Sequence, residues 1–335
     1  MQAAPSAITI LEVARRAGVS PSTVSRVVNG SAGVSERKRL AVEAMIRELK
    51  FRPNPSARSL KTGTTMSIGV VVQDLESPFF TRMLRGIEEG LADSGHVPII
   101  VSGLWNAEEE EARIHLLAER RIDGLIVLAG HLSDEQLIEF ARIQPVAVAG
   151  RHLSGPNLSG HWVDQDEAGH LATSHLLSLG HRRIAFIAGP DSHADARHRH
   201  EGYLRAHREH GLAPDPALYT RGDFMETGGL LAMNRLLDAH APFTAVFAAN
   251  DQMAYGARVA LFRRGIRVPD DISMVGVDDM PASAFMTPAL TTVRQPLHEI
   301  GRHVAAELLR LLGRDAPQVE VPGMRLVVRE TTRRL

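Results

Sequence analysis

The fold of the N-terminal part is decided by residues 9–29, which read TILEVARRAGVSPSTVSRVVN. Thr9 and Glu12 have the spacing of a capping box, in which the hydroxyl caps the first turn and the carboxylate reaches back. A short helix follows, with an apolar face made by Leu11, Val13, Ala14 and Ala17. Gly18 ends this helix, because glycine accepts the left-handed conformation that is common at helix ends.

A second helix opens two residues later, with Ser20 as its N-cap and Pro21 at its first position. Two helices joined by a short turn with a glycine make a helix-turn-helix, whose second helix enters the DNA major groove. The residues that we expect to pack inward are Val24, Val27 and Val28. The side chains left to contact DNA are Ser22, Thr23, Ser25, Arg26 and Asn29. Arginine can read guanine with two hydrogen bonds.

A third helix is predicted from Ser35, as its cap, through Leu49. The apolar positions that we expect to close the bundle are Leu40, Val42, Ala44, Met45, Ile46 and Leu49. A stable three-helix unit without DNA contacts is the alternative interpretation of this pattern.

Charge is divided unevenly along the chain. Residues 1–62 carry eleven Lys or Arg against four Glu, a net charge of +7, whereas the rest of the chain has a net charge of −8. A basic head on an acidic body is typical of a polyanion-binding module joined to a domain with another task. A merely solvated basic surface is the alternative.

Composition excludes several classes of protein. The 335 residues are 44% hydrophobic and contain no cysteine, which excludes disulfides, cysteine-bound zinc and thiol catalysis. No apolar run reaches the ~20 residues of a membrane span, and the N-terminus lacks the pattern of an export signal. We therefore expect a cytoplasmic, nucleoid-associated protein with no cofactor.

Beyond residue 66, short apolar runs alternate with helical patterns. The predicted strands are Ser67–Val72, Val97–Ser102, Gly124–Leu128 and Val146–Ala149, then Ile184–Ala188, Ala245–Ala248 and residues 273–277. Two such series predict an α/β body of two doubly wound parallel-sheet subdomains that follow the small all-α head. Ligands bind such sheets at the carboxyl ends of the strands.

These motifs together resemble the lac/galactose repressor family of bacterial transcription regulators. The resemblance is dense over about sixty residues and continues through SPFF at 77–80, GHRRIA at 180–185, Asn250-Asp251 and PALTTV at 288–293. It implies a homodimeric repressor on a palindromic operator, controlled by a small molecule bound in a periplasmic-binding-protein-like clamshell. No leucine heptad follows the body, which favours a dimer over a tetramer.

The implied domains are a helix-turn-helix domain at 1–50, a hinge helix and linker at 51–65, and an effector and dimerisation domain at 66–335. Its N-subdomain is expected at about 66–162 and 293–318, and its C-subdomain at about 163–292 and 319–335. The expected chain crossings lie near residues 161–165, 290–294 and 319–321.

The hinge is expected at residues 55–60, with Asn54 as its cap. A helix this short is marginal without a partner. The resemblance implies that Leu60 wedges into the minor groove while Ala57 and Arg58 line it; an ordinary linker is the alternative. The full set of DNA-contact candidates is Thr9, Ser20, Pro21, Ser22, Thr23, Ser25, Arg26, Asn29, Ser35, Asn54, Ala57, Arg58 and Leu60.

Candidate effector contacts follow the strands of the body, and they are Phe79, Asp195, Arg199, Phe224, Asn250 and Asp278. Aromatic faces with carboxylate, amide and guanidinium groups suit a sugar ring. The resemblance places Arg199, Phe224, Asn250 and Asp278 at effector-contacting positions. Asp195 opens a helix that we expect to end at Gly202-Tyr203. Helix caps are the alternative role for Asp195 and Asp251, and a turn cap for Asp279.

The resemblance favours a sugar over a purine or nucleoside, because purine-responsive members carry arginine where this chain has His193. Three positions depart from the family pattern: Lys50 at a helix end, Gln165-Asp166 at a crossing and Ala149 after the fourth strand. The last two affect contacts between subdomains, and the change at 165–166 bears on allosteric signalling.

Three rival functions are disfavoured. Several histidines (His193, His198, His200, His207 and His210) suggest a metal, but they point in several directions on one helix and lack a His-Glu-x-x-His motif. No nucleophile elbow, P-loop or dinucleotide fingerprint suggests an enzyme. A solute-binding protein would need an export signal and would not need the basic head.

Overall fold

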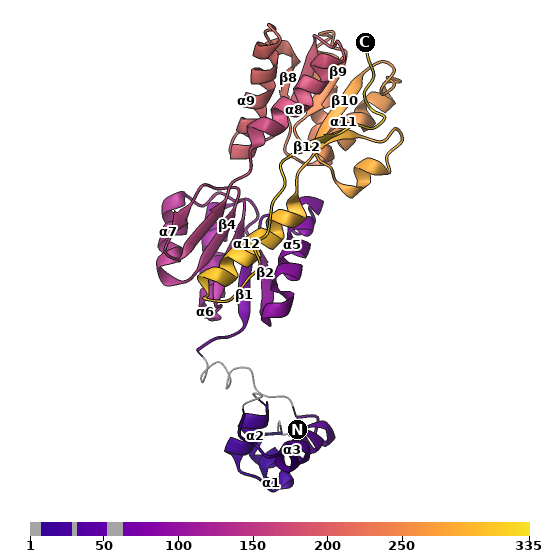
Figure 1. Cartoon of the computed structure of the whole chain (residues 1–335). Coiled ribbons are helices and arrows are strands. Elements are labelled where there is room, and N and C mark those ends of the chain that lie inside the picture. Colours follow the sequence, from indigo (N-terminus) through magenta and orange to yellow (C-terminus); the bar gives the residue numbers. More distant parts are fainter. Residues whose placement is uncertain (1–7, 29–31, 52–62) are drawn as a thin grey trace, which may run out of the picture. The chain divides into compact units, whose positions relative to one another are not determined.

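The computed structural model describes residues 8–28, 32–51 and 63–335, which form two units divided at residue 65 (Figure 1). In the first unit, helices α1 (Ile10–Ala17), α2 (Pro21–Val28) and α3 (Glu36–Glu48) enclose a small core. This core is built on Val13, Ala14, Val24, Val42 and Phe51. The predicted three-helix head is therefore present, with Val27 and Val28 packed against the core as expected.

Local chemistry sets most of the helix ends in the head. The Thr9 side chain accepts a hydrogen bond from the backbone N–H of Glu12, and Gly18 ends α1 in the left-handed conformation at φ 65°. Lys50, which follows α3, also has a positive φ, of 49°. The resemblance implies glycine or asparagine at this position, and the Lys50 backbone takes the left-handed conformation that those residues favour.

Three sequence predictions for the head are wrong. The Glu12 carboxylate accepts hydrogen bonds from Arg15 and Arg16 instead of reaching back to the cap, because both cations lie within a turn. Ser35 does hold the predicted N-cap position of α3, although its side chain makes no cap hydrogen bond. Leu11 and Leu40 are 63% and 51% exposed, because both lie on the outer faces of their helices.

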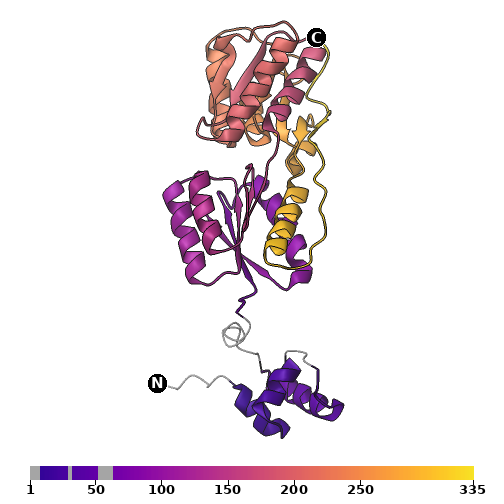
Figure 2. The same cartoon turned by 60° about the vertical axis from the view of Figure 1, so that its left-hand side comes forward.

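The second unit contains two six-stranded sheets, each with helices on both faces (Figures 1 and 2). The first sheet has the order β2-β1-β3-β4-β6-β5. Its strands are β1 (Ser67–Val72), β2 (Val97–Ser102), β3 (Gly124–Leu128), β4 (Val146–Ala149), β5 (Ser154–Gly155) and β6 (Leu158–His161). Helices α6 (Ala107–Glu119) and α7 (Asp134–Ile143) cover one face, and α5 (Pro78–Leu91) and α12 (Leu297–Leu311) cover the other. We call this sheet with its helices the first lobe.

The second lobe has the sheet order β12-β11-β10-β9-β7-β8. Its strands are β7 (Ile184–Ala188), β8 (Tyr219–Arg221), β9 (Ala245–Ala248), β10 (Ser273–Asp278), β11 (Thr291–Arg294) and β12 (Arg325–Val327). Its helices are α8 (Gln165–Ser178), α9 (Ala194–Glu209), α10 (Glu226–Asp238) and α11 (Asp251–Arg263). Strands pair in parallel in both lobes, except where β5 meets β6 and β12 meets β11. All seven predicted strands are present.

The chain crosses between the lobes three times. It leaves the first lobe after β6, returns after β11 to form α12, and crosses again before β12. Because Val293 and Arg294 still belong to β11, the return falls at Gln295-Pro296, slightly later than the sequence predicts. A second difference concerns α9, which runs on to Glu209 instead of ending at Gly202-Tyr203. No helix within the described ranges is long and apolar enough to cross a membrane.

The helices of each lobe pair by close backbone contact at glycines. A Cβ added at Gly202 of α9 would lie 2.0 Å from the carbonyl oxygen of Asp166 in α8, and one at Gly169 of α8 would lie 2.0 Å from that of Arg199. The pairs α5–α12 and α10–α11 use glycines in the same reciprocal way, at Gly86 with Gly301 and at Gly229 with Gly256. These contacts explain why Gly202 lies inside a continuous helix.

Candidate functional site

The head presents a row of hydroxyl groups at the N-terminus of α2. The Ser20 Oγ accepts a hydrogen bond from the Thr23 backbone N–H at 3.2 Å, and it also lies 2.8 Å from the Ser22 Oγ and 2.9 Å from the Thr23 Oγ1. Pro21, Ser22 and Arg26 are exposed on the same helix. A helix N-terminus that offers hydroxyls and backbone N–H groups is suited to phosphate contacts.

The DNA-contact candidates are thus only partly described. Thr9, Ser20, Pro21, Ser22, Thr23, Ser25, Arg26 and Ser35 lie in the described part of the head. Asn29 and the hinge residues Asn54, Ala57, Arg58 and Leu60 lie outside the described residues. Their roles stay predictions.

In the body, all six effector candidates line one pocket between the two lobes, with a volume of about 350 Å³. Phe79 comes from the first turn of α5, which is opened by Pro78. Asp195 and Arg199 lie one helical turn apart on α9, so that both face the pocket. Phe224 follows β8, Asn250 follows β9 and Asp278 ends β10, as expected for the carboxyl ends of parallel strands.

A closed ring of four side chains lies beneath the pocket. The Arg199 Nε donates to the Gln165 Oε1 at 2.9 Å, and the Gln165 Nε2 donates to the Gln295 Oε1 at 2.9 Å. The Gln295 Nε2 donates to the Asp278 Oδ1 at 2.6 Å, and that oxygen lies 3.6 Å from the Arg199 Nη2. All four side chains are buried. Since Gln165 follows the first crossing and Gln295 lies at the second, the ring joins the pocket floor to both crossings.

Asn250 has a structural role as well as a place in the pocket. Its Oδ1 accepts a hydrogen bond from the Met253 N–H and caps α11, and its Nδ2 donates to the carbonyl oxygen of Phe224 at 2.8 Å. The cap predicted as an alternative for Asp251 therefore belongs to Asn250. Asp195 is not a cap either, because His193 holds the N-cap position of α9.

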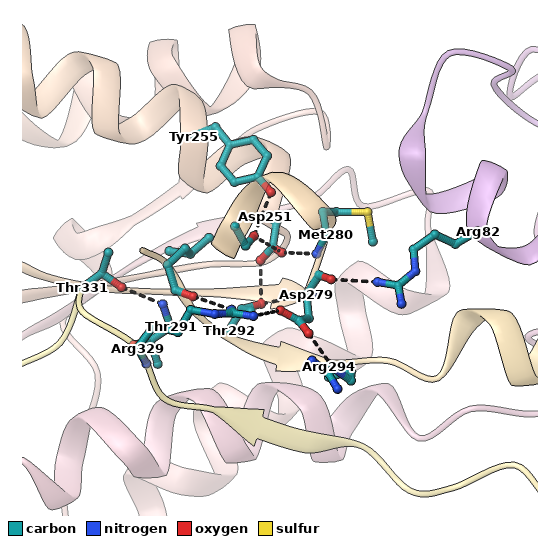
Figure 3. Close-up of polar contacts among 12 residues, drawn as sticks. Arg82, Asp251, Tyr255, Asp279, Met280, Thr291, Thr292, Arg294, Arg329 and Thr331 are labelled. Atoms are coloured by element: carbon teal, nitrogen blue, oxygen red, sulfur yellow. Dashed lines mark hydrogen bonds and ion pairs between the residues drawn. The ribbon is translucent and has the colours of Figure 1, made fainter. Parts of the chain in front are cut away.

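Behind the pocket, the buried Asp251 carboxylate accepts hydrogen bonds from three groups (Figure 3). The donors are the Met280 N–H at 2.8 Å, the Ser283 hydroxyl at 2.7 Å and the Thr292 hydroxyl at 2.6 Å. Burial raises the pKa of Asp251 to about 8, with a further contribution from Asp278. Burial likewise raises the pKa of Asp278 to about 6, against the opposing effect of Arg199.

Asp279 connects the two lobes instead of capping a turn. Its carboxylate pairs with Arg294 at 2.5 Å and with Arg329 at 2.6 Å, both from the second lobe. Its carbonyl oxygen accepts a hydrogen bond from Arg82 of α5, in the first lobe, at 2.8 Å (Figure 3). Asp278 and Asp279 both have positive φ, of 112° and 53°, so the backbone after β10 is held in a strained conformation.

Part of the pocket wall is made by residues that no sequence motif marks. Trp105 and His131, from the loops after β2 and β3, line it together with His193. No motif marks Trp105 or His131, because each follows an ordinary strand end, and His193 stands out in the sequence only as a metal candidate and as a departure from the purine-responsive pattern. No group of three or more His, Asp or Glu in the described part of the chain is placed to hold a metal ion.

The chain matches known proteins over both units. Residues 9–54 match the bacterial regulatory proteins of the lacI family, and residues 173–332 match the periplasmic binding protein-like domain. The transcriptional regulator GalR of Escherichia coli K12 is 38% identical over 317 residues, which cover 94% of this chain and 92% of GalR.

Two solved structures show the same architecture. The lac repressor dimer bound to operator and the anti-inducer ONPF has a TM-score of 0.87 and 31% identity, over 98% of this chain and 99% of that one. The regulator CelR in complex with cellobiose has a TM-score of 0.71 and 34% identity, over 97% and 99% of the two chains. The chain belongs to the lacI family of bacterial regulatory proteins.

Proposed function

We propose that this regulator is a homodimeric repressor that binds a palindromic operator and responds to a small sugar bound between the lobes of its body. The observation that carries the proposal is the pocket itself. It gathers Phe79, Asp195, Arg199, Phe224, Asn250 and Asp278 in a chain whose other unit is a lacI-type head. The protein acts by binding and not as an enzyme.

DNA recognition is assigned to α2. Its exposed Ser22 and Arg26 face away from the head core, and the hydroxyls of Ser20 and Thr23 lie at its N-terminus. One such helix covers half a site, and a two-fold symmetric dimer matches the two halves of a palindrome. Since operator DNA is its target, we place the protein in the cytoplasm at the nucleoid.

The body offers apolar surface for the second copy. Val97 and Ile100 are exposed on β2, which is the edge strand of the first sheet. In the second lobe, Phe262 of α11 is 82% exposed and Phe285 is 86% exposed. Exposed large aromatic side chains of this kind mark contact surfaces. The lac repressor, which has the same architecture, was solved as a dimer.

A sugar is favoured by the chemistry of the lining. Aromatic faces at Phe79 and Phe224 can stack on the apolar face of a pyranose ring, while Asp195 and Asp278 can accept hydrogen bonds from its hydroxyls. The similar regulator CelR was solved with cellobiose. A nucleoside is the second candidate, because its base would also stack on these rings.

The proposal is tested by a thermal-shift screen of sugars and nucleosides, followed by gel-shift titration of operator DNA with each hit. A ligand at about 100 times its Kd should add roughly 2.7 kcal/mol of stability. The expected result is a sugar that stabilises the protein and changes operator affinity. A protein that sediments as a stable monomer while it binds operator tightly would contradict the dimer.

A further inference from the structure

The pocket holds a contact between rings that come from opposite lobes. The Trp105 ring of the first lobe lies over the His193 ring of the second, with centroids 4.1 Å apart and planes inclined by 32°. His131 of the first lobe lies 5.1 Å from His193, and Phe224 lies 5.3 Å from it. These four rings form a continuous aromatic wall, which we call the ring wall, across the two lobes.

The first-lobe half of the ring wall is held by two buried side chains. The Gln73 Oε1 accepts a hydrogen bond from the backbone N–H of Trp105 at 3.2 Å, and the Glu110 Oε1 accepts one from the backbone N–H of His131 at 2.7 Å. Gln73 and Glu110 are 1% and 0% exposed. The loops that they hold include Trp105 and Ala129 at φ 54° and 57°, a conformation that such residues rarely adopt. The wall is therefore preorganised.

The charge of the pocket lining is unsuited to an anion. Four carboxylates line it, from Asp74, Asp195, Asp223 and Asp278. Among the described lining residues the one arginine is Arg199, and its guanidinium already donates to Gln165 and to the carbonyl oxygen of Ala249 and lies beside Asp278. Burial lowers the pKa of His131, and it lowers the pKa of His193 to about 4, so that both rings are neutral at pH 7.

We propose that Trp105 is a specificity-determining residue of the effector pocket, and that the ring wall with the surrounding carboxylates selects an uncharged ring-shaped ligand and rejects phosphate esters. This inference rests on the proposed effector role of the pocket and deepens it. An apolar ring face stacks on the wall, whereas a phosphate would lie among carboxylates with no uncommitted arginine of the lining to pair with. Uncharged sugars and nucleosides share the required chemistry.

The chain has two tryptophans, which allows a matched fluorescence experiment. Trp162 lies outside the pocket, where it stacks on His152 with ring centroids 4.6 Å apart. The full-length Trp162→Phe variant therefore leaves Trp105 as the only tryptophan, and Trp105→Phe leaves Trp162. Each is titrated with glucose, cellobiose, ribose and adenosine and with glucose 6-phosphate, cellobiose 6-phosphate, ribose 5-phosphate and AMP. Calorimetry gives the Kd values, including those of Trp105→Ala.

In the Trp162→Phe variant, we expect at least one uncharged probe to change the emission of Trp105, with a Kd at least about tenfold below that of its phosphate ester. The same probe leaves Trp162 emission unchanged in Trp105→Phe. Its affinity falls about tenfold in Trp105→Ala, and less in Trp105→Phe, which keeps a ring. Melting curves of both variants show whether the fold is kept. If Trp105→Ala does not fold, the smaller loss of affinity in Trp105→Phe becomes the test.

Three results would overturn the inference: a phosphate ester that binds as tightly as its uncharged partner, wild-type affinity in the folded Trp105→Ala protein, or no binding by any uncharged probe. Gel shifts with operator DNA separate this failure from that of the proposed function. A phosphate ester that binds and changes operator affinity contradicts only the uncharged-ligand inference. An uncharged probe that binds through Trp105 and leaves operator affinity unchanged contradicts only the regulatory role.

Discussion

Asp251 is the residue whose burial has the clearest consequence for stability. Its carboxyl is surrounded by the Met280 N–H and the hydroxyls of Ser283 and Thr292. Replacement by alanine leaves those groups without their partner, so we expect Asp251→Ala to lower the free energy of unfolding by about 3 kcal/mol. Asp251→Asn keeps an oxygen toward two donors and should cost less than about 1 kcal/mol. Urea denaturation of both variants is the measurement.

The same carboxyl predicts the direction of a pH effect. Its pKa is raised from 3.8 to about 8 on folding, so the native state holds a proton that the unfolded state releases between these values. The free energy of unfolding contributed by Asp251 therefore falls as the pH rises through this window. As the pH rises, the free energy of unfolding of the wild type should therefore fall relative to that of Asp251→Asn, which has no titrating group at this position. An unchanged difference between about pH 5 and about pH 8 contradicts the raised pKa.

Asp278 is predicted to serve the effector and not the DNA. Asp278→Asn keeps an oxygen for Gln295 but loses the negative charge that accepts ligand hydroxyls. We expect operator binding to remain while effector affinity falls by about 2 kcal/mol, so that the response to ligand is lost at the concentration that saturates the wild type and needs about thirtyfold more ligand. Asp223→Asn is the matched control, because Asp223 is an exposed carboxylate of the same pocket. If Asp223→Asn and Asp278→Asn lose the same amount of effector affinity, Asp278 has no special role in binding the effector.

Arg26 is the residue on which sequence preference is predicted to depend. If it binds guanine with two hydrogen bonds, Arg26→Ala weakens operator binding by about 1–3 kcal/mol and relaxes base preference. Competition gel shifts against operator and random DNA measure both effects. An equal loss for the two DNAs would show that Arg26 contacts only phosphate.

At the scale of elements, the reciprocal glycines set the spacing of the paired helices. Gly202→Ala would place a methyl group 2.0 Å from the carbonyl oxygen of Asp166, so α8 and α9 must move apart. We expect a loss of about 2 kcal/mol in the free energy of unfolding. Gly323→Ala is the control, because nothing lies within 4 Å of a Cβ there and its φ is ordinary. Comparable thermal melting of the two variants would contradict this packing.

Elements were predictable from the sequence where a pattern is local and continuous. Six of the seven predicted strands are apolar runs that the fold buries, and the seventh, β2, is an apolar run on a partly exposed edge. Ser20 and Gly18 mark helix ends by their own chemistry. The five strands β5, β6, β8, β11 and β12 were missed because each is two to four residues long and carries polar side chains such as Ser159, Thr220 and Arg325. Strands of this kind are stabilised by their neighbours in the sheet and not by their own pattern.

The pocket likewise contains residues that could be predicted from the sequence and residues that could not. The six predicted side chains follow strands or open helices, so topology alone brings them together. Trp105 and His193 meet only because two loops from different lobes are held opposite one another, by Gln73 and Glu110 on one side. Contacts that depend on tertiary structure on both sides leave no spacing to recognise in the sequence.

At the scale of the whole molecule, the proposed function requires coupling between effector and operator. A ligand can change operator affinity only by its differential affinity for the two states of the protein, typically worth about 1–3 kcal/mol. Operator DNA must then change the ligand's affinity by the same factor. Titrating the identified effector with and without operator measures both directions. Equal dissociation constants would mean that the body and the head are not coupled.

The ring formed by Arg199, Gln165, Gln295 and Asp278 makes ligand choice and responsiveness inseparable. Arg199 and Asp278 line the proposed effector pocket, and Gln165 and Gln295 lie where the chain passes between the lobes. Retuning this protein as a biosensor by substituting Arg199 or Asp278 would therefore also disturb the pivot between the lobes. We expect that many variants with substitutions at Arg199 or Asp278 no longer change their operator affinity when a ligand is added. Retuning through Phe79 or Trp105, which stand outside the ring, leaves the pivot intact and is the better starting point.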